Sequence, residues 1–121
     1  MKPTEKIETG YANNTDEIRR MILENPDLPI LAFAGEDAVC EDYRWTTCTC
    51  VYIKKGEFLD CYQEIDDCRV YTDRRDFAED LEEHLYNELD INGEELDELV
   101  KQELAEYEPY WKPCLLLYVD N

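Results

Sequence analysis

The second half of the chain has the clearest hydrophobic pattern. Its apolar residues recur every three or four positions, which is the period of an amphipathic helix. Asp73 is a good N-cap for a helix over 74–89. Asn92, with Glu95 three residues later, forms a capping-box-like start to a second helix over 93–107. The residues expected to face inward are Phe77, Ala78, Leu81, Leu85 and Leu89 on the first helix, and Leu96, Leu99, Val100 and Leu104 on the second.

Two apolar runs of strand length stand outside this helical pair. Thr15 can cap a short helix over 16–24, and the run 28–34 follows it. Pro29 lies in that run and favours a strand start or a sheet edge, because proline cannot donate to a sheet ladder. The run 114–119 is almost continuously apolar, which favours a central strand buried on both faces.

The middle of the chain predicts a three-stranded antiparallel meander. Its strands cover 45–53, 58–65 and 68–72, joined by tight turns at Lys55-Gly56 and Asp66-Asp67. Because side chains alternate between the faces of a strand, one face of this meander carries four of the six cysteines. They are Cys48, Cys50, Cys61 and Cys68.

These elements together predict an α+β fold. We expect an antiparallel sheet of about five strands, with the two acidic helices packed on its cysteine-bearing face. The chain has 121 residues and neither an internal repeat nor a Gly/Ser-rich linker, which favours a single domain over 1–121. The polar segment 1–14 is expected to be flexible.

The charge of the chain is its most unusual property. Its 31 acidic residues outnumber its 12 basic residues, so the net charge is −19, while a hydrophobic content of 44% is ordinary for a globular protein. The segment 73–108 holds 15 acids and 3 bases and carries −12 of that charge. Direct binding to nucleic acid is not expected, because contact with phosphates needs clustered Lys and Arg.

The outer faces of the two predicted helices form a candidate binding surface for a basic protein. Like charges three or four residues apart destabilise a helix, and interspersed lysines would provide solubility at a smaller cost. The alternative is a face that is merely solvated. The candidate partner-binding residues are Asp76, Glu79, Asp80, Glu83, Glu94, Asp97 and Glu98.

Catalytic and metal-binding patterns are weak. The chain has one histidine, His84, and no serine, and it carries none of the common nucleotide-binding or hydrolase motifs. The cysteines lack paired C-x₂₋₄-C spacing, so we expect buried thiols rather than a zinc site. Residues 1–12 do not resemble a signal peptide, which favours a cytoplasmic location and reduced cysteines. The prediction is a non-enzyme without cofactor or metal, although a chance pair of carboxylates stays open.

Two stretches resemble small acidic proteins of phages and mobile elements of Firmicutes. They are the segment NPDLPI over 25–30 and the ending WKPCLLLYVDN over 111–121. Those proteins are of uncharacterised function, and the similarity covers structural positions only, so it assigns no role to any residue. Short, very acidic proteins of this context include anti-CRISPR proteins and other DNA mimics, which this chain resembles in size and composition.

The leading functional hypothesis is an anti-CRISPR-type inhibitor that acts as an acidic DNA mimic. It would block the basic nucleic-acid-binding groove of a nuclease such as Cas9, by competition rather than by chemistry. The alternative is a non-enzymatic adaptor of a phage or mobile element that binds a protein partner through exposed aromatics. Its docking residues would be Trp45, Tyr62, Tyr71 and Tyr110.

Overall fold

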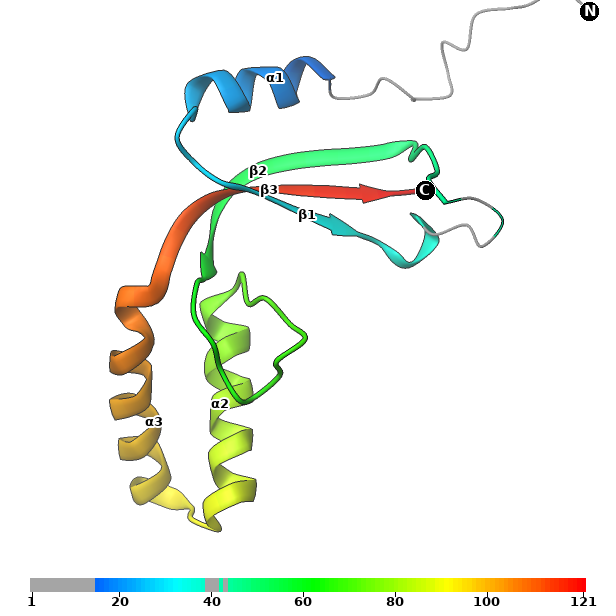
Figure 1. The fold of residues 1–121 in the computed structure, drawn as a ribbon. Coiled ribbons are helices and arrows are strands. Elements are labelled where there is room, and N and C mark those ends of the chain that lie inside the picture. Colours follow the sequence, from blue (N-terminus) through cyan, green and yellow to red (C-terminus); the bar gives the residue numbers. More distant parts are fainter. Residues whose placement is uncertain (1–14, 39–41, 43) are drawn as a thin grey trace, which may run out of the picture. The chain divides into compact units, whose positions relative to one another are not determined.

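The computed structural model describes residues 15–38, 42 and 44–121 (Figure 1). These residues form a mixed α+β fold with three α-helices, two short 3₁₀ helices and a three-stranded sheet. The chain divides into two compact units, one made of residues 1–56 with 114–121 and the other of residues 57–113. The predicted flexible segment 1–14 lies outside the described residues.

The sheet holds its three strands in the order β1-β3-β2. Strand β1 (Ile30–Ala34) runs parallel to β3 (Trp111–Asp120), and β2 (Cys50–Leu59) lies on the other side of β3. The predicted edge and central strands are therefore confirmed, and residues 114–116 of β3 are at most 2% exposed. The predicted sheet of about five antiparallel strands is wrong, because the sheet is mixed and has three strands in the described part of the chain.

The predicted turn at Lys55-Gly56 is also wrong, because β2 continues through both residues. A two-residue hairpin turn needs a positive φ, and the described residues with positive φ are Asp90 and Gly93. At Gly56 a Cβ atom would lie 2.7 Å from Cδ1 of Leu116 on the neighbouring strand. This glycine therefore permits the close approach of two strands instead of a reversal of the chain.

Residues 60–73 form a loop where two strands were predicted. Gln63, which is 5% exposed, organises this loop. Its side-chain amide donates to the carbonyls of Asp66 and Arg69, and its Oε1 accepts from the backbone N–H of Asp66 at 2.8 Å. A buried amide thus provides the backbone with the hydrogen bonds that a strand partner would otherwise supply.

Without the meander, the predicted cysteine-bearing face does not exist. Cys50 and Cys68 are exposed, Cys48 is half-buried, and of the four only Cys61 packs against the core under the helices. Cys114, on β3, is fully buried. The five cysteines that the structure describes are free thiols, and Cys40 lies outside the described residues.

The remaining N-terminal elements are the predicted first helix and one short 3₁₀ helix that was not predicted. Helix α1 (Thr15–Glu24) confirms the helix expected over 16–24. The 3₁₀ helix η1 (Glu36–Ala38) lies in the acidic segment after β1. The backbone N–H of Leu115 donates to the carbonyl of Pro29 at 2.9 Å, which extends the β1–β3 ladder by one bond.

The two acidic helices occupy the predicted ranges. Helix α2 (Arg74–Leu89) begins after Asp73, whose carboxylate accepts from the backbone N–H of Arg75 at 2.8 Å. Helix α3 (Gly93–Tyr107) follows Asn92, which holds the N-cap position but makes no side-chain capping bond. The short 3₁₀ helix η2 (Glu108–Tyr110) then leads into β3.

The core of the 57–113 unit lies between these helices and the segments before them. It consists of Leu59, Tyr71, Phe77, Leu81, Leu85 and Leu96, with Leu99, Val100 and Leu104 packed against it. The predicted inward position of Leu89 is wrong, because its side chain is 52% exposed. A four-residue step overshoots a helical turn by about 40°, so three such steps from Phe77 rotate Leu89 by about 120°, out of the core.

Candidate functional site

Helices α2 and α3 lie side by side as a hairpin in the 57–113 unit (Figure 1). Their exposed faces are densely acidic. The unit contains 20 acidic and 5 basic residues, so it carries −15 of the net −19. Ten exposed acids on the helices and the loop between them, which we term the hairpin carboxylates, form no ion pair with any described residue. They are Glu79, Glu82, Glu83, Glu88, Asp90, Glu94, Glu95, Asp97, Glu98 and Glu106.

Most cations of this unit pair with other acids. Arg69 lies 3.4 Å from Asp76 and 3.1 Å from Asp80. Arg74 lies 2.6 Å from both Glu57 and Glu108, and these carboxylates raise the pKa of its guanidinium. Lys112 lies 2.9 Å from Asp60. The other two bases, Arg75 and Lys101, lie on the helices and make no ion pair within the described structure. Ten hairpin carboxylates therefore face two unpaired bases.

The seven predicted binding residues fall into two groups. Glu79, Glu83, Glu94, Asp97 and Glu98 are exposed hairpin carboxylates. Asp76 is exposed but paired with Arg69, and Asp80 is half-buried within the fold. The binding of a partner by these seven residues stays a prediction.

Asp80 helps to hold the loop 60–73 against α2. Its Oδ2 accepts a 2.7 Å hydrogen bond from the hydroxyl of Tyr71, as well as the bond from Arg69. Tyr71 is 1% exposed, and its burial, followed by this hydrogen bond, raises its pKa to about 12. Tyr71 therefore cannot be one of the exposed aromatics of the adaptor hypothesis, which is a correction to that set.

A shallow groove of about 400 Å³ opens on the acidic surface of the hairpin. Leu96 of α3, which is 6% exposed, and the half-exposed Tyr86 of α2 supply its apolar surface. Glu79, Glu82 and Glu83 supply its carboxylates. The sequence interpretation missed Tyr86, although its position four residues after Glu82 places it on the same helical face.

A second hollow of about 290 Å³ contains the only histidine of the chain. His84 lines it together with Asp66, Asp80 and Glu83. Carboxylates and imidazoles act as nucleophiles or bases in some enzymes, and activated hydroxyls or thiols act as nucleophiles in others. The lining hydroxyl belongs to Tyr71, and its pKa of about 12 makes it harder to ionise than an ordinary tyrosine.

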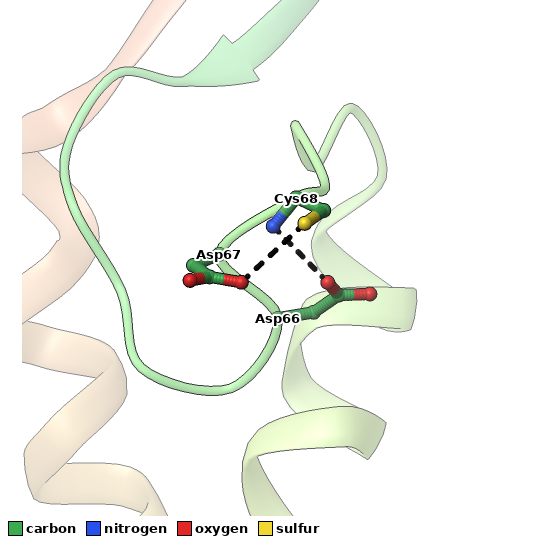
Figure 2. Close-up of side chains that lie close together, drawn as sticks. All are labelled: Asp66, Asp67 and Cys68. Atoms are coloured by element: carbon green, nitrogen blue, oxygen red, sulfur yellow. Dashed lines mark hydrogen bonds between the residues drawn. The ribbon is translucent and has the colours of Figure 1, made fainter.

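Asp66, Asp67 and Cys68 form the one group of potential metal ligands found in the described part of the chain (Figure 2). Their ligand atoms lie within 4.8 Å of one another, and all three residues are exposed. The backbone N–H of Cys68 donates to Asp66 Oδ1 at 3.2 Å, and its thiol donates to Asp67 Oδ1 at 3.5 Å. This bonding is that of an Asx-type turn, which accounts for the cluster without a metal.

Comparison with known proteins gives no match from which a function could be transferred. A functional proposal must therefore rest on the physical properties of this surface. No protein-family model, curated protein or solved structure matches the chain. Within the described residues, no helix combines the length and the apolar character needed to cross a bilayer.

Proposed function

We propose that this protein is a non-enzymatic inhibitor that uses the α2–α3 hairpin as an acidic mimic of DNA. The observation that carries the proposal is the set of ten exposed hairpin carboxylates that lack ion pairs within the described structure. The hairpin would occupy the basic groove of a nucleic-acid-binding protein and exclude the nucleic acid from it. Phage or mobile-element origin stays a prediction.

Physical chemistry supports a binding role for this surface over solvation alone. Like-charged neighbours at helical spacing cost a few tenths of a kcal/mol per pair. Here the ten unpaired acids are interspersed with two exposed bases, Arg75 and Lys101. Side chains three or four residues apart are about 5–6 Å from one another, a spacing comparable with that of phosphates along a nucleic-acid strand. A basic groove that accepts phosphates would therefore meet a similar row of charges.

Cas9 is the first target that we propose, because its guide–target duplex lies in a positively charged channel that reads backbone charge and not sequence. The inhibitor would bind by charge complementarity, which gives fast association and strong sensitivity to salt. No covalent step or cofactor is needed for this mechanism.

The test is a pull-down with the tagged protein from a bacterial lysate that contains Cas9–guide complexes. We expect capture of Cas9 at low salt and its release at high salt or on addition of competitor DNA, since free phosphates compete for the same groove. Capture of Cas9 that resists both salt and DNA would contradict mimicry. Failure to capture any nucleic-acid-binding protein would contradict the proposal and favour the alternative, in which the acidic surface only provides solubility.

The exposed aromatics favour one alternative, that of a protein-binding adaptor. Tyr62 is 77% exposed and Tyr110 is 48% exposed, and both line a hollow with Cys61, Glu106 and Tyr107. In the other unit, Trp45 is 85% exposed. Large exposed aromatics are typical anchors of protein interfaces. An adaptor of this kind would lose its partner on Tyr62→Ala and would bind it almost independently of salt.

A further inference from the structure

Two arginines of the 57–113 unit occupy the same type of environment, an aromatic ring beside two carboxylates. The guanidinium carbon of Arg69 lies 4.4 Å from the ring centroid of Tyr71. Its nitrogens bind Asp76 at 3.4 Å and Asp80 at 3.1 Å. These two acids are four residues apart on α2, so one helical face supplies both carboxylates.

Arg74 repeats this arrangement with different elements. Its guanidinium carbon lies 5.1 Å from the ring of Trp111. It donates two hydrogen bonds to Glu57 at 2.6 and 3.0 Å, and two to Glu108 at 2.6 and 2.7 Å. The planar guanidinium suits such sites because it can stack on a ring while its edge binds carboxylates bidentately.

The groove on the hairpin has the same aromatic and acidic components, but no cation of the described residues lines it. The ring of Tyr86 is 52% exposed, and no described cation lies over it. Glu79 and Glu83, four residues apart on α2, line the groove beside it, together with Glu82. Leu96 provides an apolar floor against which the methylenes of a long side chain can pack.

We infer that this groove is a docking site for an arginine side chain of a protein partner. The inference rests on the proposed function and specifies which part of the acidic hairpin selects the partner. The aliphatic stem would lie on Leu96, the guanidinium would stack on Tyr86, and its N–H groups would bind Glu79, Glu82 or Glu83. Charge complementarity identifies the occupant, because the three carboxylates that line the groove repel any anionic segment and favour a cation.

Arginine fits this groove better than lysine. A lysine ammonium is a strongly hydrated point charge, whereas a guanidinium is weakly hydrated, planar and able to stack. The field of the net charge attracts both residues equally, but bidentate binding to any carboxylate also favours arginine. A preference for arginine that depends on Tyr86 therefore reports on the groove.

The test measures binding of two peptides that have equal length and charge, one carrying arginines and the other lysines. We expect the wild-type protein to bind the arginine peptide more tightly at low salt. Tyr86→Ala should weaken that binding by about two- to fivefold, as expected for an exposed cation–π contact, and should change lysine binding little. Tyr86→Phe should retain the preference, because the ring remains.

The control is Tyr52→Ala, since the Tyr52 side chain is 50% exposed and lies outside the hairpin. This variant should bind both peptides like the wild type. Circular dichroism of each variant confirms that the fold is retained.

Three outcomes separate this inference from the proposed function. An arginine preference that disappears in Tyr86→Ala supports the docking site. Equal binding of both peptides, abolished when Glu79, Glu83, Asp97 and Glu98 are changed to Lys, overturns the docking site but leaves the acidic binding surface intact. Peptide binding that survives those four reversals overturns both.

Discussion

Asp80 and Glu83 stand three residues apart on α2 and serve different purposes. Asp80 is half-buried and accepts hydrogen bonds from Tyr71 at 2.7 Å and Arg69 at 3.1 Å. Glu83 is exposed, lines the Tyr86 groove and has no ion-pair partner in the described structure. Both residues are carboxylates on the same helix. Their roles differ because the fold places Tyr71 and Arg69 beside Asp80 but no cation of the described structure beside Glu83.

This difference predicts different stability effects for two conservative substitutions. Asp80→Asn removes the charge that Arg69 and Tyr71 bind, so it should lower the free energy of unfolding by about 1 kcal/mol. Glu83→Gln removes an unpaired charge from a like-charged surface, so it should leave stability unchanged or raise it slightly. Urea denaturation of both variants measures the two effects. Equal destabilisation by both would show that the two acids share one role.

The buried hydroxyl of Tyr71 predicts a loss of stability at alkaline pH. Its pKa is raised from 10 to about 12 in the folded state, so ionisation is harder in the folded than in the unfolded chain. The stability that this group contributes is fully present below pH 10 and is lost as the pH rises towards about 12. Tyr71→Phe should lower stability at neutral pH by about 1–2 kcal/mol and should reduce the decline across that alkaline range.

Chemical denaturation of the wild type and Tyr71→Phe, repeated from neutral to alkaline pH, tests this directly. The wild type should lose more stability than the variant between pH 10 and about 12. Parallel curves for the two proteins would mean that Tyr71 ionises equally easily in both states.

At the scale of elements, local signals predicted α2 and α3, whereas non-local contacts decided the middle of the chain. Asp73 and the recurrence of Phe77, Leu81 and Leu85 act within one helix, so the sequence alone located α2. Gly56 has two structural uses, in a turn and in a close approach of strands. Only the position of Leu116, sixty residues later, distinguishes them.

The sequence also predicted only part of the candidate site. Helical periodicity placed Glu79, Glu83, Glu94, Asp97 and Glu98 on outward faces, and the structure finds them exposed. Helical periodicity could not show that Tyr71 and Arg69 bind Asp80, because the loop that carries these two residues was predicted as strands. Pairing of charges is a tertiary property, which sequence spacing does not determine across such a loop.

The strand assignment of Gly56 makes its own prediction. Gly56→Ala would place a methyl group 2.7 Å from Cδ1 of Leu116, whose side chain is 2% exposed and has little room to move. Overpacking of this kind should lower the free energy of unfolding by about 1–3 kcal/mol. A hairpin turn with a positive φ at this glycine would also be destabilised by alanine, so the companion variant is Leu116→Ala.

Combining Gly56→Ala with Leu116→Ala separates the two explanations. If the contact is steric, the double variant should be more stable than the sum of the two single effects predicts, because the smaller residue 116 makes room for the methyl group. Additive effects would contradict the close approach of the strands at Gly56.

For the whole molecule, the uneven distribution of charge is the dominant property. The segment 57–113 carries −15 and the rest of the chain −4, so self-repulsion is concentrated in the unit that contains the hairpin. Raising the ionic strength from about 0.01 M to about 1 M shortens the screening length from about 30 Å to about 3 Å. The exposed ion pairs contribute little, so their screening should not outweigh the relief of repulsion.

We therefore expect the melting temperature to rise with sodium chloride concentration over that range. The rise should be smaller in a hairpin-reversal variant with Glu79→Lys, Glu83→Lys, Asp97→Lys and Glu98→Lys, because its hairpin repels itself less. Differential scanning calorimetry compares the two proteins. A melting temperature that falls with salt in the wild type would show that attractive charge pairs outweigh repulsion.

The measurement that tests the central claim most directly is displacement of labelled DNA from a Cas9–guide complex. It compares the wild type with the hairpin-reversal variant and with a control variant in which Asp27, Glu36, Asp37 and Asp42 are changed to Lys. Both variants shift the net charge from −19 to −11, and all four control acids are exposed and lie outside the 57–113 unit. We predict that the wild type and the control variant displace DNA, whereas a folded hairpin-reversal variant does not. Equal displacement by both variants, or none by the wild type, would contradict the account.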